Sequence, residues 1–364
     1  MNEKKETVVL IGNHHIVIYN FRKEFVKRLI EAGYRVVVVL PCTKEAERIK
    51  ELGCEVEDVP VDRRGMNPIK DAGQLLHYRK ILKELKPRIV FTYTIKPNIY
   101  GGFACRLLKI PYVCTVTGLG KAIEEGGIMR NILLFMYKVA LQRAQKVFFQ
   151  NDANRAVFAD KNIGGKRYAL VKGSGVNLEE FSRMEFPPKT DSIRFIWVAR
   201  IAKMKGIDIF LEAAERVKTK YPQTEFRVLG FIEEDYKEIM QDYENRKVIN
   251  YRGMQQDVRP DLEECQCLIL PSEAEGMSNA CLEAAACGRA LITTDVPGCR
   301  ECVADGISGY LIQPGSVEDL TEKIEKFICL PYNERKHMGE MGREKMEQEF
   351  SRETVVDAYM QEIK

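Results

Sequence analysis

The stretch TVVLIGNHHIVIYNFRKEFVKRLIEAGYRVVVVLP, residues 7–41, holds two short apolar runs on either side of a helical pattern. The runs TVVLIG (7–12) and YRVVVVLP (34–41) are almost wholly aliphatic, and FRKEFVKRLIEAG (21–33) has apolar residues at helical spacing. Strands without polar alternation are typical of a parallel sheet covered by helices on both faces. Similar runs follow at RIVFTYT (88–94), YVCTVTG (112–118) and KVFFQN (146–151). We therefore predict a doubly wound parallel sheet in the first half of the chain.

The same alternation begins again after EFPPKTDS (185–192). Strand-like and helical patterns follow in turn at IRFIWVAR (193–200), IDIFLEAAERVKTKY (207–221), EFRVLG (225–230), VINYRG (248–253), CLILPS (267–272), ALITTD (290–295) and GYLIQP (309–314). A chain of 364 residues exceeds an ordinary single core, and the Pro-Pro pair indicates a linker near 178–192. The prediction is an α/β protein with two Rossmann-like domains, 1–178 and 179–345. Ligands of such sheets bind beyond the carboxyl ends of the strands, so we expect the site in a cleft that the domains face.

Charge and cysteine content narrow the class of partner. The chain has 56 Lys and Arg against 53 Asp and Glu, a formal charge of +3 interspersed along the sequence, which favours a small molecule over nucleic acid. The 11 cysteines follow no framework spacing, and the N-terminus shows no signal-peptide pattern, so a reducing cytoplasm is expected. No apolar run is long enough to predict a transmembrane helix.

The stretch EAEGMSNACLEAAACG, residues 273–288, places Glu275 and Glu283 with seven residues between them. If a helix begins near Ser278, Glu275 lies in the loop before it and Glu283 lies on its second turn. A helix N-terminus attracts anions because its first N–H groups have no partner within the helix. Gly276 allows this backbone to approach a phosphate closely, and Ser278 or the residue after it can cap the helix.

Two cations are predicted to join this site. The strand IRFIWVAR ends at Arg200, and Lys205 follows in the turn IAKMKG. A planar guanidinium and a point charge at the carboxyl end of a strand suit a diphosphate, although a solvated turn is the alternative for the two cations alone. Together with residues 273–288 they predict a diphosphate cradle, in which Glu283 accepts hydrogen bonds from ribose hydroxyls and Glu275 contacts a group beyond the phosphates. Such a site fits a nucleoside diphosphate sugar.

These segments resemble a known family. EAEGMSNACLEAAACG, VARIAKMKGIDIF, PGCRE and DGISGYLIQPG are similar to the C-terminal domain of retaining glycosyltransferases of family 4, which have the two-domain GT-B fold. NFRKEFVKRLIEAGYRV, TYTIKPNIYGGFA and VTGLG resemble the subgroup that builds bacterial capsule, O-antigen and related lipid-linked glycans. The resemblance implies transfer of a hexosyl or N-acetylhexosaminyl group from a nucleoside diphosphate sugar, expected to be a UDP-sugar, to a glycan acceptor. The expected acceptor is a polyprenyl diphosphate-linked saccharide in surface polysaccharide synthesis.

The resemblance also implies residue roles. Arg200 and Lys205 would hold the donor diphosphate, Glu275 would contact the transferred sugar, and Glu283 would bind the ribose. The residues whose backbone would meet the phosphates are Gly276, Met277, Ser278 and Asn279. Anomeric configuration would be retained, with the leaving diphosphate oxygen helping to deprotonate the acceptor. No Asp-x-Asp motif occurs in the chain, so cations and a helix dipole are expected to replace a metal ion, and no cofactor is expected.

Candidates in the first domain follow the strand ends. IGNHHIVIYNF follows the first strand and lacks the G-x-G-x-x-G fingerprint of dinucleotide-binding enzymes. Gly12 is assigned to the donor side. The acceptor-side candidates are Asn13, His14, His15, Lys96, Asn98, Thr117 and Gly118. Many family members carry a histidine where this chain reads TVTGLGK, so no catalytic role passes to His14 or His15 by resemblance.

Three other segments carry expectations. The cysteines of CRECV and CQC (Cys299, Cys302, Cys265 and Cys267) are expected to be buried small hydrophobes, with a four-thiolate zinc site as the alternative. NILLFMYKVALQR (131–143) fits a core helix, or a helix resting in lipid headgroups. By resemblance, residues 346–364 form a terminal helix that packs back on the first domain.

The sequence therefore predicts a cytoplasmic glycosyltransferase, with peripheral contact at the inner face of the cytoplasmic membrane left open. Two other classes remain as alternatives. A non-hydrolysing nucleotide-sugar epimerase would convert the donor without an acceptor. A non-catalytic nucleotide-sugar binding protein would bind the donor without turnover.

Overall fold

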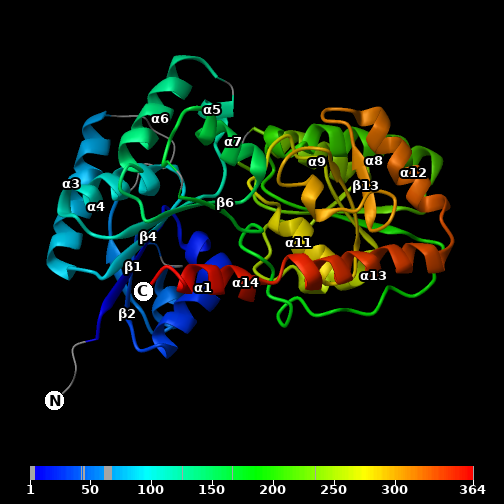
Figure 1. The fold of residues 1–364 in the computed structure, drawn as a ribbon. Coiled ribbons are helices and arrows are strands. Elements are labelled where there is room, and N and C mark those ends of the chain that lie inside the picture. Colours follow the sequence, from blue (N-terminus) through cyan, green and yellow to red (C-terminus); the bar gives the residue numbers. More distant parts are fainter. Residues whose placement is uncertain are drawn as a thin grey trace. The chain divides into compact units, whose positions relative to one another are not determined.

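The computed structural model describes residues 5–41, 43, 46–60, 68–124, 126–165, 167–233 and 235–363. The chain divides into two compact units, Met1–Gly175 with Arg352–Lys364, and Val176–Ser351 (Figure 1). The first division lies close to the predicted position 178. The second follows residue 351 rather than 345, because helix α13 (Tyr332–Glu349) continues to Glu349.

The first unit contains, within its described residues, a parallel sheet of seven strands in the order β3-β2-β1-β4-β5-β6-β7. The strands are β1 (Thr7–Ile11), β2 (Arg35–Leu40), β3 (Glu55–Asp58), β4 (Ile89–Tyr93), β5 (Tyr112–Val116), β6 (Lys146–Phe149) and β7 (Tyr168–Leu170). The five inner strands are the predicted apolar runs, so the doubly wound sheet is confirmed. The two edge strands, β3 and β7, were not predicted.

Helices cover both faces of this sheet. They are α1 (His15–Glu31), α2 (Glu47–Lys50), α3 (Pro68–Leu85), η2 (Pro97–Gly101), α4 (Gly102–Leu108), α5 (Lys121–Glu124), α6 (Gly127–Ala140), α7 (Asp152–Asp160) and α14 (Arg352–Met360). Successive residues of a strand point to opposite faces. Val8 and Leu10 accordingly join a core with α1 and α14, while Val9 and Ile11 join a core with α3, α4 and α6. Burial on both faces explains why the inner strands have no polar alternation.

Helix α14 is part of the first unit and lies beside α1, red beside blue in Figure 1. Its Tyr359 ring packs 5.3 Å from the ring of Phe25 and 5.1 Å from that of Phe148, and Thr115 Oγ1 donates to the Tyr359 hydroxyl at 3.2 Å. Arg352, only 3% exposed, donates to the Gly175 carbonyl and pairs with Glu24. Helix α14 therefore belongs to the same hydrophobic core as β1 and α1.

The second unit contains, in the part that the structure describes, a parallel sheet of six strands in the order β10-β9-β8-β11-β12-β13. The strands are β8 (Arg194–Val198), β9 (Glu225–Leu229), β10 (Asn250–Tyr251), β11 (Cys267–Leu270), β12 (Ala290–Thr294) and β13 (Gly309–Ile312). All six lie within the predicted runs. The chain passes from β8 outward to β10 and returns to β11 on the other side of β8, so a topological switch point lies between β8 and β11.

The remaining elements of this unit are η3 (Lys203–Lys205), α8 (Ile207–Lys220), α9 (Lys237–Asn245), α10 (Arg259–Glu264), α11 (Asn279–Ala286), η4 (Arg300–Cys302), α12 (Val317–Cys329) and α13. Helix α8 packs on α12, and α11 packs on α13. Residues 177–192 form neither helix nor strand and belong to the second unit. Among the described residues of the whole chain, no helix is long and apolar enough to cross a membrane.

Candidate active site

The switch point of the second sheet gathers the predicted cations and the predicted anion-binding helix. Because β8 and β11 are parallel neighbours, the segments after them leave the same edge of the sheet. Arg200 and Lys205 follow β8, and the loop 271–278 follows β11 and leads into α11. In open α/β sheets this edge is where ligands bind.

A glycine joins these two segments. Gly206 has φ +73°, and a Cβ there would lie 1.9 Å from the Pro271 carbonyl oxygen, so the backbone approach requires glycine. The Met204 carbonyl accepts hydrogen bonds from Glu273 N at 3.0 Å and Ser272 Oγ at 3.2 Å. The turn that carries Lys205 is therefore fastened to the loop that carries Glu275.

Both predicted diphosphate cations are paired with carboxylates. Lys205 Nζ lies 2.5 Å from Glu275 Oε1, and the two side chains are only 13% and 14% exposed. Arg200 pairs with Glu233, which follows β9. Three of these four residues were predicted as site residues. The pairing of Arg200 with Glu233 was not predicted, because ion pairing between residues 33 positions apart leaves no local pattern.

Helix α11 begins where the sequence predicted. Ser278 is its N-cap, with extended backbone, and its hydroxyl accepts a hydrogen bond from Cys281 N at 3.4 Å. Asn279, the first helical residue, is half-buried, and its Oδ1 is buried without a hydrogen-bond partner in the described part of the chain. Glu283 is half-buried on the second turn. The N-terminal turn thus presents backbone donors and one unsatisfied amide oxygen.

The segment PGCRE (297–301) packs against the loop that carries Glu275. Gly298 has φ +86°, and a Cβ at this position would lie 2.5 Å from the Glu275 carbonyl oxygen. Its carbonyl accepts from Ser278 N at 2.8 Å, and its own N–H donates to Glu301 Oε2 at 2.7 Å. Buried Cys299 follows, and burial raises the pKa of its thiol well above the usual value. This supporting role depends on packing between distant segments, so the sequence of the segment does not reveal it.

The candidates in the first unit lie at the carboxyl edge of their own sheet, where β1 neighbours β4. Gly12 is buried and its N–H donates to the Val39 carbonyl at 3.1 Å. Asn13 is half-buried in the turn that follows. His14 is the N-cap of α1, with its Nδ1 accepting from Ile16 N at 3.3 Å, and its ring centroid lies 4.2 Å from that of His15. The structure therefore gives His14 a capping role.

The segment after β4 is more buried than expected. Lys96 Nζ lies 2.6 Å from Asp71 Oδ1, with the side chains 14% and 12% exposed, so Lys96 is not a free turn lysine. Tyr100 donates to the same carboxylate at 3.0 Å, and burial raises the pKa of its hydroxyl.

Asn98 is fully buried: its Oδ1 accepts from Thr92 Oγ1 at 2.7 Å and its Nδ2 donates to the Thr115 carbonyl at 2.9 Å. These bonds tie β4 to β5. The placement of Asn98 contradicts the expectation that it contacts an acceptor, because both ends of its amide are used within the sheet. Thr117 and Gly118, which follow β5, are half-buried.

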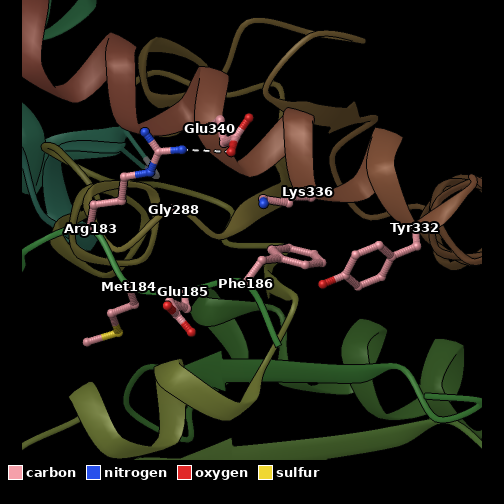
Figure 2. Close-up of a pocket in the computed structure, with 8 residues that line it drawn as sticks. All are labelled: Arg183, Met184, Glu185, Phe186, Gly288, Tyr332, Lys336 and Glu340. Atoms are coloured by element: carbon pink, nitrogen blue, oxygen red, sulfur yellow. Dashed lines mark hydrogen bonds and ion pairs between the residues drawn. The ribbon is translucent and has the colours of Figure 1, made fainter. Parts of the chain in front are cut away.

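A hollow of about 510 Å³ lies elsewhere on the second unit, at the end of α11 that leads to Gly288 (Figure 2). In it Arg183 pairs with Glu340 at 2.7 Å, and the rings of Phe186 and Tyr332 meet edge to face at 5.6 Å. These contacts hold the extended segment after residue 176 against α13.

Among the described residues, no three His, Cys, Asp or Glu side chains are grouped as metal ligands. Cys265, Cys267, Cys299 and Cys302 are all fully buried.

The two units match separate family descriptions. "Glycosyl transferases group 1" matches residues 179–345, and "Glycosyl transferase 4-like" matches residues 7–151. The chain is a glycosyltransferase with a group 1 domain and a 4-like domain. The matched ranges contain every candidate residue of the site.

Two similar glycosyltransferases act on lipid-linked sugars, according to their names. The N,N'-diacetylbacillosaminyl-diphospho-undecaprenol alpha-1,3-N-acetylgalactosaminyltransferase of Campylobacter jejuni is 27% identical over 331 residues, which cover 85% of this chain and 86% of that protein. The UDP-Gal:alpha-D-GlcNAc-diphosphoundecaprenol alpha-1,3-galactosyltransferase of Escherichia coli is 27% identical over 280 residues, 71% of each chain.

Solved structures share the fold. The Anabaena protein HepE in complex with UDP-glucose superposes with a TM-score of 0.79 at 15% identity, covering 98% of both chains. A glycosyltransferase from Rickettsia africae has a TM-score of 0.78 at 17% identity, covering 99% of this chain and 98% of that one. The predicted GT-B class of this glycosyltransferase, with two parallel-sheet Rossmann-like domains, is confirmed.

Proposed function

We propose that this glycosyltransferase transfers a hexosyl or N-acetylhexosaminyl group from a UDP-sugar to a saccharide carried on a polyprenyl diphosphate, with retention of anomeric configuration. The observation that carries the proposal is the meeting of Lys205, Glu275 and the α11 N-terminus at the switch point of the second sheet. The names of the two similar enzymes support the lipid-linked acceptor.

In the proposed donor complex, Arg200 and Lys205 bind the diphosphate together with the first N–H groups of α11. Negative charge grows on the diphosphate as the glycosidic bond breaks, so these groups stabilise the transition state more than the ground state. Asn279 Oδ1, buried without a partner among the described residues, would accept a hydrogen bond from a donor hydroxyl. Glu283 would accept hydrogen bonds from the ribose.

Glu275 would leave Lys205 when the diphosphate arrives and turn to the transferred sugar. Its backbone position is fixed by Gly298, and its loop is fixed by Met204, so the carboxylate can exchange partners while the loop stays in place. The leaving diphosphate oxygen then takes the proton of the acceptor hydroxyl on the same face. Bond formation and proton transfer on one face give retention, and no metal ion is required.

The first unit is proposed to hold the acceptor. Lys96, already within a buried ion pair, and the half-buried Thr117 and Gly118 lie beyond adjacent strands. A lysine in this position can bind an acceptor phosphate as a point charge if Asp71 is displaced.

The outer face of α6 is proposed to rest on a membrane that carries the acceptor. Ile128, Ile132 and Phe135 are 81%, 45% and 66% exposed, at helical spacing along one face. Exposed Lys138 continues this face, whereas Leu134 and Tyr137 on the opposite face are buried in the core. Apolar side chains flanked by cations suit an interface with anionic lipid headgroups. Co-sedimentation with anionic vesicles should weaken in Ile128→Glu/Phe135→Glu, and no binding by the wild-type protein would refute this part.

The function is tested by incubating the enzyme with a panel of UDP-sugars, with and without a synthetic polyprenyl diphosphate-linked saccharide. The proposal expects UDP release that depends on the acceptor, together with an extended glycan. Interconversion of the donor without an acceptor would show an epimerase instead. Tight donor binding without turnover across the panel of acceptors would favour a binding protein.

A further inference from the structure

We propose that Glu233 lowers the affinity of the donor site for diphosphates, because it holds Arg200 in the empty enzyme and competes with the diphosphate for it. The inference rests on the proposed function, because it takes Arg200 as a ligand of the donor diphosphate. Glu233 lies beyond β9, outside the two segments that predicted the diphosphate cradle.

The backbone fixes Glu233 beside Arg200. Gly230 has φ +150°, and a Cβ there would lie 1.7 Å from the Ala199 carbonyl oxygen, so glycine is required for the strand-end segments to run this close. Beyond it, Ile201 N donates to the Phe231 carbonyl at 2.9 Å and Glu233 N donates to the Ile201 carbonyl at 3.2 Å. These bonds continue the pairing of β8 with β9 and place the two side chains at the same sheet edge.

The burial of the two partners is unequal. The Glu233 side chain is 13% exposed, whereas that of Arg200 is 41% exposed. The carboxylate is therefore the fixed partner, and the guanidinium is the partner with room to turn toward a ligand. A diphosphate must take Arg200 from this carboxylate, as it must take Lys205 from Glu275.

Glu275 and Glu233 have different contacts once the diphosphate has bound Lys205 and Arg200. Glu275 has the transferred sugar to contact in the proposed complex. Glu233 is left beside a diphosphate of the same charge sign, which opposes binding. After transfer, the free nucleoside diphosphate carries more negative charge than the diphosphate of the donor, so this opposition is greater for product than for donor. Glu233 thus favours product release over product retention.

The effect is modest because Arg200 is partly exposed. Ion pairs at this exposure change affinities by roughly two- to fivefold, and the change shrinks as salt screens the charges. Glu233→Gln, which keeps the size and removes the charge, should bind UDP and inorganic diphosphate more tightly by this factor at low ionic strength.

The test is isothermal titration calorimetry with UDP and with inorganic diphosphate on the full-length protein. Glu273→Gln is the matched control, since Glu273 is an exposed carboxylate on the neighbouring loop. We expect Glu233→Gln to bind both probes roughly two- to fivefold more tightly and Glu273→Gln to match the wild type. The gain should disappear at about 0.5 M salt and in an Arg200→Ala background.

Equal or weaker binding by Glu233→Gln would overturn the inference, and weaker binding would show that Glu233 positions Arg200 instead. If the wild-type protein binds neither probe, the proposed function fails and the inference falls with it. If the wild type binds UDP and Glu233→Gln shows no gain, the inference alone fails.

Discussion

Lys205 Nζ and Glu275 Oε1 lie 2.5 Å apart, joining the turn after β8 to the loop after β11. The pair brings together a cation suited to the diphosphate and a carboxylate suited to the sugar. Because both side chains are largely buried, each needs a partner in the empty site. The donor would supply new partners for both, which makes the pair a preformed part of the site.

Replacing the cations should mainly slow the chemical step. Lys205→Ala and Arg200→Ala are each expected to lower kcat by about 100- to 1000-fold, because charge stabilisation on the leaving diphosphate is lost. Steady-state kinetics with saturating donor and acceptor measure this. Circular dichroism should show an intact fold, and turnover near the wild-type value in both variants would remove their proposed roles.

Glu283→Ala should act on donor binding. Loss of the hydrogen bonds that the ribose hydroxyls donate to this carboxylate is expected to weaken UDP binding about tenfold or more, with little change in kcat. Calorimetry with UDP gives the affinity, and Glu273→Ala is the exposed control. An unchanged affinity would place the ribose elsewhere.

Gly298 and Gly315 provide a matched pair of glycines. Both have positive φ, but a Cβ at Gly298 would meet Glu275, whereas a Cβ at Gly315 has nothing within 4 Å. Gly315→Ala should cost about 1–2 kcal/mol from backbone conformation alone. Gly298→Ala should cost about 1–3 kcal/mol more, and it should also weaken donor binding because the Glu275 loop must shift. Urea unfolding measures the difference, and equal losses in the two variants would argue against the contact.

Thiol reactivity should follow burial. Burial raises the pKa of Cys114 and Cys265 to about 12, so each thiol stays protonated below that pH in the folded protein, whereas in the unfolded chain it ionises near its usual pKa. At about pH 8, iodoacetamide should therefore modify exposed Cys329 and leave these two unmodified until denaturant is added. Peptide mass spectrometry measures the labelling. Rapid modification of Cys265 in the native protein would contradict its placement.

Activity should survive removal of divalent cations. The proposed mechanism stabilises the leaving diphosphate with Arg200, Lys205 and the α11 N-terminus, so an excess of EDTA should leave kcat nearly unchanged. Loss of turnover that is restored by Mg²⁺ would show that a metal ion takes part.

In the first unit, the sequence predicted the five inner strands well and the two edge strands poorly, for one physical reason. Inner strands are buried on both faces and must be apolar, as VVL in β1 and CLIL in β11 are. Strand β3 reads EVED and is largely exposed, so nothing in its composition distinguishes it from a loop. Strand β7 has three residues, none of them fully buried. Both lie at sheet edges, where the partner strand rather than the sequence determines the conformation.

The donor site shows a similar limit. The cap was predicted to be Ser278 or Asn279, and it is Ser278, because N-capping is local and has a strong residue preference. The partners of the two cations depend on how distant loops pack, as does the support that Gly298 gives to Glu275. Asn98 shows the opposite error: its place after a strand suggested a surface contact, while the π-helical turn η2 directs it into the sheet.

The most direct test of the account is proton NMR of the reaction with an α-linked UDP-sugar and a polyprenyl diphosphate-linked saccharide. The proposed retaining mechanism predicts a new glycosidic signal with the small coupling constant of an α-linkage, which appears only with acceptor and together with UDP. A β-linked product, or donor conversion that does not need the acceptor, would contradict it.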